Sequence, residues 1–356
     1  MGQNGYVFKH YCLMSNFKIM QKSYLGVDVS KLTFDVSLIA VINGNKQPVV
    51  TNQFTNDKTG LGLFKAWLEA NQVSFNGNSL LVLENTGIYH RPLWNFCTDH
   101  LLPFFIGNAA DLKWSFGIAR GKTDKVDSIR LCGYAYKNHE DIKPTTGLNK
   151  ALITIKDLSS NRSKLLKQKN AITQTLNELK VSNDKTTQQL LERLNKAAID
   201  GLQKSIKAIE AELQKMVKQD DSVLINYNRL LTVPGIGKVT AVFIICCSNN
   251  FSVKLTGKQL SSYAGVVPFE NTSGTSIKGR NRVHFMANKE LKSLLTMGAM
   301  SAIQNYPEFR DYYNRKIKEG KKHLQVLNAI KNKILLRVAA VINGQKDYVN
   351  KYNVAC

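Results

Sequence analysis

The sequence is poor in the features that mark zinc-binding, disulfide-linked and membrane-spanning proteins. Its six cysteines include no Cys-x-x-Cys pair and no regular spacing, which disfavours a zinc site or a disulfide framework and favours a reducing compartment. Cys246 and Cys247 fall in an apolar run, AVFIICC, and are expected to be buried thiols. No apolar run reaches the roughly 18 residues that a membrane span needs, and the first twenty residues lack a signal-peptide core. We therefore expect a cytoplasmic protein with no membrane partner.

Acidic residues are also scarce relative to basic ones. Asp and Glu number 26 against 49 Lys and Arg, so the formal net charge of the 356 residues is +23. A surplus of this size favours a polyanionic partner, because basic surfaces gain from releasing the counterions condensed on nucleic acid. The surplus is spread along the chain, which predicts a broad binding surface. The alternative is a basic protein without such a partner.

The region 24–146 has short β-branched runs interrupted by helical patterns. Three expected strands are followed by a helix, a strand, a second helix and a last strand. This is the element order of a ribonuclease-H-like α/β domain. The segments, in chain order, are 24–29, 33–41, 48–54, 57–72, 79–84, 89–100 and 102–107.

The rest of the chain is predicted to be mostly helical. The stretch 147–227 is rich in Lys, Gln and Leu and predicts two long coiled-coil helices joined near 181–184. Its basic residues could contact nucleic acid or simply form a solvated face. From 228 to 342 we expect a separate domain: a tight turn at 234–237, a Gly-, Ser- and Arg-rich loop over 257–285, and a helical tail. Residues 1–23 and 343–356 are assigned to an N-terminal extension and a C-terminal tail.

Four acidic residues suggest a metal centre. Asp28 and Glu84 lie in or at the end of apolar strands, where an unpaired carboxylate is costly to bury, and Asp124 and Asp127 are spaced to share one face of a helix. Hard divalent ions such as Mg²⁺ or Mn²⁺ prefer carboxylate oxygens, and two such ions can clamp a phosphodiester. The alternative for Asp124 and Asp127 is a helix start favoured by the helix dipole.

Five segments in this order resemble the DEDD transposases of bacterial insertion sequences, in the family called insertion sequence one-ten. The segments are GVDVSK, LENTGIYH, KTDKVD, TVPGIGKVTA and YAGVVPFENTSGTSIKG. The resemblance implies a RuvC-like domain, a coiled-coil linker and a helical transposase domain. It implies that Asp28, Glu84, Asp124 and Asp127 bind metal and that Ser273 attacks DNA to form a phosphoserine link. It further implies a bridge RNA that guides the enzyme to donor and target DNA, and a dimer that assembles to a tetramer.

Several residues are expected to contact nucleic acid. The turn at 234–237 is similar to a helix-hairpin-helix turn, whose backbone amides bind phosphate, although an ordinary helix entry would have the same sequence. Around the serine, basic side chains could hold phosphates, with Lys292 at a position where the family commonly has Arg. The predicted contacts are Gly235, Gly237, Lys238, Lys278, Arg280, Arg282 and Lys292.

Three other functions are compatible with parts of the sequence. A RuvC-type endonuclease using metal-activated water explains the acids, with Ser273 as an ordinary turn-capping residue. GVDVSK also resembles the first phosphate loop of actin-like kinases and ATPases, but the further glycine-rich loops of those proteins are missing. A non-catalytic RNA-binding protein is the third alternative.

Overall fold

The computed structural model describes residues 21–85, 87–117, 123–145, 150–181, 185–273 and 277–350. The side chains at 270–273, 277, 278 and 280 lie outside that description. Contacts within the chain divide it into two compact units, one ending at Gly147 and one beginning at Leu148. We describe each unit by itself. The predicted separation of the second unit into a helical linker and a C-terminal domain stays a prediction.

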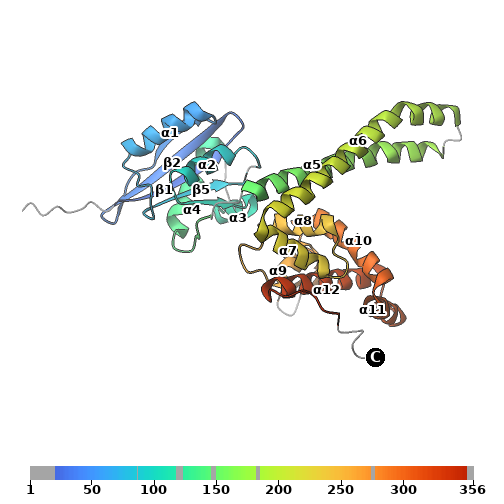
Figure 1. Ribbon diagram of the computed structural model, residues 1–356. Coiled ribbons are helices and arrows are strands. Elements are labelled where there is room, and N and C mark those ends of the chain that lie inside the picture. Colours follow the sequence, from blue (N-terminus) through green and yellow to red (C-terminus); the bar gives the residue numbers. More distant parts are fainter. Residues whose placement is uncertain are drawn as a thin grey trace, which may run out of the picture. The chain divides into compact units, whose positions relative to one another are not determined.

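The first unit is built on a mixed six-stranded sheet (Figure 1). Its strands are β1 (Gln21–Val29), β2 (Thr33–Ile42), β3 (Asn45–Lys46), β4 (Val50–Thr55), β5 (Ser79–Glu84) and β6 (Phe104–Gly107). β2 pairs antiparallel with β1 and β4, whereas β5 runs parallel to both β1 and β6. The predicted chain order of strands and helices is confirmed. The two-residue strand β3 was not predicted, and β1 begins at Gln21, before the expected boundary at residue 24.

Helices cover both faces of this sheet. α1 (Lys58–Ala70) and α2 (Arg91–Asp99) contribute Phe64 and Phe96 to an aromatic cluster with Phe34 and Phe54 on one face. The other face packs on α3 (Ala109–Ser115) and α4 (Asp124–Asn138) through a second buried cluster. That cluster includes Tyr24, Ile39 and Val82 from β1, β2 and β5. Because side chains alternate along a strand, residues at even steps from these three lie on the α4 face.

The second unit is largely helical. α5 (Lys150–Leu179) and α6 (Lys185–Gln219) lie side by side as the two predicted long helices (Figure 1). α7 (Asp221–Thr232), α8 (Lys238–Cys247), α10 (Lys289–Asn305) and α12 (His323–Asn343) bury a continuous apolar core. The fold of this part therefore depends on helix packing.

Three details differ from the sequence predictions. The expected loop over 257–285 contains a helix, α9 (Gly257–Tyr263), and an antiparallel hairpin of β7 (Phe269–Ser273) and β8 (Ile277–Arg282). α9 begins at a capping box between Thr256 and Gln259. The expected single helical tail is three helices. A new helix, α11 (Pro307–Lys318), starts at Pro307, and it is followed by Gly320, whose φ of +79° ends the helical conformation. Of the two thiols expected to be buried at the end of α8, Cys246 is half-buried and Cys247 is exposed.

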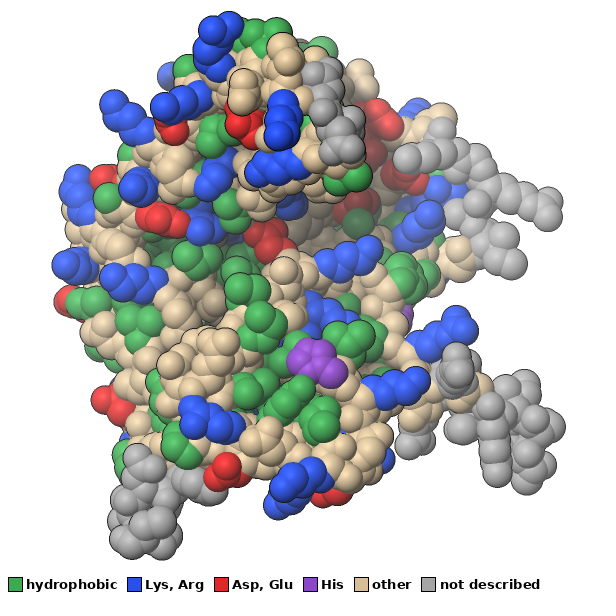
Figure 2. Space-filling view, turned by 90° about the vertical axis from the view of Figure 1, so that its right-hand side faces the viewer, with side chains coloured by type: hydrophobic (Ala, Val, Ile, Leu, Met, Phe, Trp, Pro, Cys, Tyr) green, Lys and Arg blue, Asp and Glu red, His purple; other side chains and the backbone are tan. Residues whose placement is uncertain are grey.

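Basic side chains are dispersed over the visible surface in Figure 2. Lys and Arg side chains are scattered among neutral and apolar ones over the described part of the face in Figure 2. In the part of the chain that the structure describes, every helix is too short or too polar to span a bilayer. On the face in Figure 2, the basic side chains are spread as the sequence predicted.

Candidate functional site

The strand order brings Asp28 and Glu84 to the same edge of the sheet. β1 and β5 are parallel neighbours with Val27 opposite Leu83, so Asp28 and Glu84 are the next residues along each strand. Both acids lie at even steps from Tyr24 and Val82, and both therefore face α4. Both side chains are half-buried. The two carboxylates predicted from the strands thus share one edge and one face.

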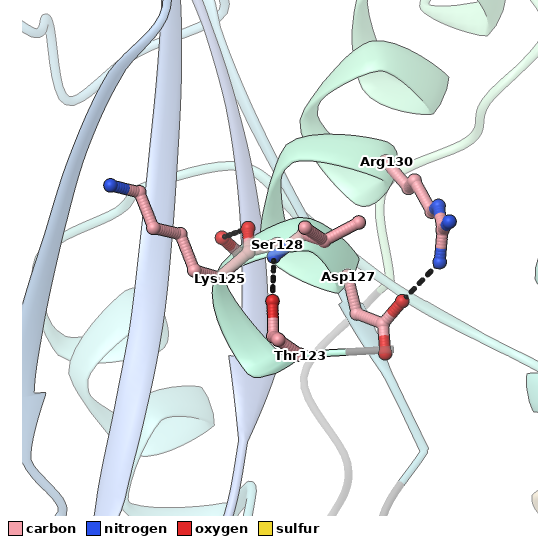
Figure 3. A network of polar contacts seen from close by, with 6 residues as sticks. Thr123, Lys125, Asp127, Ser128 and Arg130 are labelled. Carbon is pink, nitrogen blue, oxygen red and sulfur yellow. Dashed lines mark hydrogen bonds and ion pairs between the residues drawn. The ribbon is translucent and has the colours of Figure 1, made fainter. Parts of the chain in front are cut away.

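The other two predicted acids lie in the first turn of α4, as their spacing indicated. Thr123 caps the helix by accepting a hydrogen bond from the Val126 backbone N–H at 3.3 Å (Figure 3). Asp124 is exposed, and Asp127 is half-buried beside Arg130, which contacts its Oδ1 at 2.7 Å. A carboxylate at a helix N-terminus is also stabilised by the helix dipole. The observed geometry is therefore compatible with both predicted roles of Asp124 and Asp127, metal binding and stabilisation of the helix start.

α4 is held against the sheet by a close approach at Gly26. A Cβ added to Gly26 would lie 1.9 Å from the Cys132 backbone nitrogen and 2.3 Å from the Ser128 carbonyl oxygen, so only glycine fits here. Ser37 on β2 and Ser128 on α4 form a buried hydroxyl–hydroxyl hydrogen bond of 2.7 Å. Cys132 Sγ donates to the Tyr24 carbonyl at 3.1 Å. These contacts hold α4 against β1 and β2, the strands that carry Asp28 and Asp35.

The pKa of Asp28 reflects the other acids around it. Burial and the negative charges of Asp124, Asp127, Glu84 and Asp35, in that order, raise the pKa of Asp28 from 3.8 to about 6. The other three predicted acids, on β5 and α4, therefore act electrostatically on Asp28. Among the described residues, ion pairs with Lys or Arg reach Asp127 but not Asp28 or Glu84.

Two residues of this site were missed in the sequence. Asp35 is directly opposite Asp28 across the β1–β2 ladder. It is an acidic residue within the apolar run TFDVSLIAV, which is the same sequence pattern that singled out Asp28. Gly26, two residues before Asp28, could be found only once the helix packing on β1 was known.

The acids have suitable chemistry for a divalent ion, although they do not yet enclose one. All are hard oxygen donors, and the uncompensated charge around Asp28 favours a cation. Within the described ranges, no three His, Cys, Asp or Glu side chains lie close enough to hold a common ion. Of these acids, Asp127 also forms an ion pair, through its Oδ1, with Arg130 at 2.7 Å.

Ser273 is the last residue of β7, in the second unit, and its backbone is paired with Ile277 of β8. The side chains of Ser273, Lys278 and Arg280 fall outside the described residues. Arg282 is exposed at the end of β8, opposite Phe269. The hairpin thus places the predicted serine at the end of β7 and Lys278, Arg280 and Arg282 on β8.

The turn at 234–237 has a clear packing role. Gly235 has φ +84°, and a Cβ there would meet the Gly298 carbonyl oxygen of α10 at 2.7 Å. Gly237 is the N-cap of α8 with open space around it, and Lys238 is exposed beside it. Lys292 is half-buried on α10. Packing accounts for Gly235, while Gly237 and Lys238 remain accessible for the predicted phosphate contacts.

Two family models match the chain. Residues 25–198 match a transposase model of the IS110 (insertion sequence one-ten) DEDD type, and residues 227–314 match that of the transposase IS116/IS110/IS902 family. The first match includes the four predicted acids and the second includes Ser273. Together the two matches span most of the chain.

Several known proteins have similar sequences. The pilin gene-inverting proteins of Moraxella bovis and Moraxella lacunata are each 29% identical over 341 residues, which cover 92% of this chain and 98% of each relative. The 43.6 kDa protein of insertion element IS110 from Streptomyces coelicolor is 34% identical over 98 residues, 28% of this chain and 24% of that protein.

Among solved structures, RuvC of T. thermophilus in complex with a Holliday junction substrate covers 35% of this chain and 99% of its own, with a TM-score of 0.24 and 9% identity. A score this low does not establish a shared fold, so the α/β character of the first unit rests on its own strand order. The two family models and the relatives together assign the sequence. The chain belongs to the IS110 family of DEDD transposases.

Proposed function

We propose that this transposase is an RNA-guided recombinase that moves its own insertion sequence through a covalent phosphoserine intermediate. In this proposal Ser273 is the nucleophile, and Asp28, Glu84, Asp124 and Asp127 bind Mg²⁺ or Mn²⁺. The observation that carries the proposal is the convergence of carboxylates from β1, β5 and α4 around Asp28. A divalent cation would stabilise such a cluster, in which the described Lys and Arg residues pair with Asp127 but not with Asp28 or Glu84.

The serine step is chemically balanced without a nucleotide cofactor. The Ser273 oxygen forms a bond to a DNA phosphorus, the bond from that phosphorus to one deoxyribose oxygen breaks, and the serine proton is transferred to a base. The released deoxyribose oxygen takes up a proton. Rejoining reverses these steps, with a deoxyribose hydroxyl attacking the phosphoserine. Bound divalent ions would supply electrostatic stabilisation of the attacked phosphate and the departing oxygen.

The names of the relatives support a reaction that includes strand rejoining. The two Moraxella proteins are named for inverting a pilin gene, and inversion of a gene requires that cut strands be resealed. A phosphoserine retains the energy of the phosphodiester bond, so resealing needs no external energy source. By the same family resemblance, a structured RNA would choose the donor and target DNA, and protomers would assemble as dimers and then tetramers.

The proposal is tested by trapping the protein–DNA adduct. Purified protein with its co-purifying RNA, Mg²⁺ and labelled element-end DNA is run on a denaturing gel. We expect a slow, protease-sensitive DNA band that Ser273→Ala and Asp28→Ala both abolish. Ser276→Ala, which changes a second serine three residues along the chain, is the matched control and should retain the band.

The competing function predicts a different product. A RuvC-like endonuclease that uses metal-activated water releases free DNA ends and forms no adduct. Cleavage that persists in Ser273→Ala, but not in Asp28→Ala, would contradict the serine mechanism and support the hydrolytic one.

A further inference from the structure

A fifth carboxylate faces the proposed metal site from β2. Asp35 is the direct cross-strand partner of Asp28 in the antiparallel β1–β2 ladder, and opposed residues in such a ladder project from the same face of the sheet. Two residues further on, Ser37 bonds to Ser128 of α4, which independently places this side of β2 beneath α4. Asp35 therefore faces the same space as Asp28.

The Asp35 side chain is fixed in place by a neutral partner. Only 9% of Asp35 is exposed, and its Oδ2 accepts a hydrogen bond from Gln53 Nε2 at 2.9 Å. Gln53 is the cross-strand partner of Asp35 on β4. Asp28, Asp35 and Gln53 thus form a polar row across three neighbouring strands. The amide orients the carboxylate without neutralising it.

This arrangement is unfavourable unless a cation is bound. Like charges directly opposite each other destabilise an antiparallel pair, and a buried carboxylate requires compensation. Within the described residues, Lys and Arg form ion pairs with neither Asp28 nor Asp35. Two apolar residues at these positions would give a more stable sheet, so the pair points to a ligand-binding role.

We propose that Asp35 is a positioning residue of the metal site: held by Gln53, it supplies a fifth negative charge that strengthens divalent-cation binding at Asp28. The inference rests on the proposed function, because it takes the divalent ion of that site as its ligand. Partners that orient or charge a metal ligand from the next layer typically change metal affinity by about 10–100-fold when they are removed.

The test is a Mn²⁺ titration of the full-length protein carrying Asp35→Asn. The asparagine Oδ1 can still accept the bond from Gln53, so the substitution removes charge while it keeps shape. We expect the unfolding midpoint in EDTA to equal or exceed that of the wild type, because repulsion with Asp28 is relieved. We expect the Mn²⁺ affinity, measured by calorimetry and by the Mn²⁺-induced shift of the midpoint, to fall at least tenfold.

A purely structural role for Asp35 predicts the opposite pattern. In that case Asp35→Asn lowers the midpoint in EDTA and leaves the Mn²⁺ affinity unchanged, and the inference is wrong. Asp57→Ala provides the matched control, since Asp57 is an exposed acid of the same unit that caps α1 by accepting from the Gly60 N–H. It should lower the midpoint in EDTA without changing Mn²⁺ affinity.

The same titration separates this inference from the proposed function. If wild-type protein binds Mn²⁺ and Asp35→Asn binds it equally well, only the role of Asp35 fails. If the wild type shows no Mn²⁺-dependent shift and no heat of binding, the metal site fails and the inference fails with it.

Discussion

Asp28 links the acidic site to the stability of the metal-free protein. Its pKa is about 6 in the folded chain against an ordinary value of 3.8, so between these pH values the folded state binds a proton that the unfolded state does not. Stability from this group is therefore present at low pH and is lost as pH rises from about 4 to about 6. At pH 7.5 the ionised carboxylate costs at most about 3 kcal/mol, less any screening by solvent.

The prediction at this scale is that Asp28→Asn stabilises the metal-free protein. In EDTA at pH 7.5, we expect its free energy of unfolding in urea to exceed that of the wild type by about 1–3 kcal/mol. The difference should shrink as pH falls toward 4, because wild-type Asp28 then becomes neutral. A difference that is constant between pH 4 and pH 7.5 would show that charge on Asp28 is not its cause.

At the scale of an element, the position of α4 depends on Gly26. Gly26→Ala forces a methyl group into the backbone of α4 at Cys132 and Ser128. We expect a loss of at least about 1–3 kcal/mol in the free energy of unfolding, the range for overpacking a core. Displacing α4 also moves Asp124 and Asp127 away from Asp28, so Mn²⁺ affinity should fall as well. Urea unfolding and calorimetry measure the two effects.

Gly133→Ala is the matched control for this substitution. Gly133 lies within α4 itself, and a Cβ there meets no atom within 4 Å. Because alanine is the better helix former, we expect Gly133→Ala to stabilise the protein by about 0.5–1 kcal/mol and to leave Mn²⁺ affinity unchanged. If both variants behaved alike, helix propensity and not the close approach at β1 would explain the result.

Elements with a clear hydrophobic pattern could be predicted from the sequence, whereas contacts between elements could not. Short β-branched or apolar runs correctly predicted β1, β2 and β5, and the spacing of Asp124 and Asp127 predicted their common helical turn. The β7–β8 hairpin was missed because its Gly, Ser and Asn residues are typical of loops, and the ladder bonds that form it are not encoded in periodicity. The Gly235–Gly298 approach is likewise visible only after α10 has packed.

At the scale of the whole molecule, the net charge of +23 makes affinity for DNA strongly dependent on salt. Under the proposed function, Lys278, Arg280 and Arg282 on β8 contact phosphates of the element end. Each phosphate contact contributes roughly one to the slope of log K against log salt concentration. Replacing all three with alanine should therefore reduce that slope by about 3 and weaken binding equally for related and unrelated duplexes. Fluorescence anisotropy across a salt series measures both quantities.

A matched triple variant distinguishes phosphate contact from a general loss of charge. Lys65, Arg315 and Lys316 already pair with carboxylates, Lys65 with Glu69 and the other two with Glu319. Removing them lowers the net charge by the same three units, but paired side chains on other elements have no assigned phosphate, so the slope should change little. Equal changes for the two triple variants would mean that the protein attracts DNA through its overall charge, and that β8 makes no specific contact with the backbone.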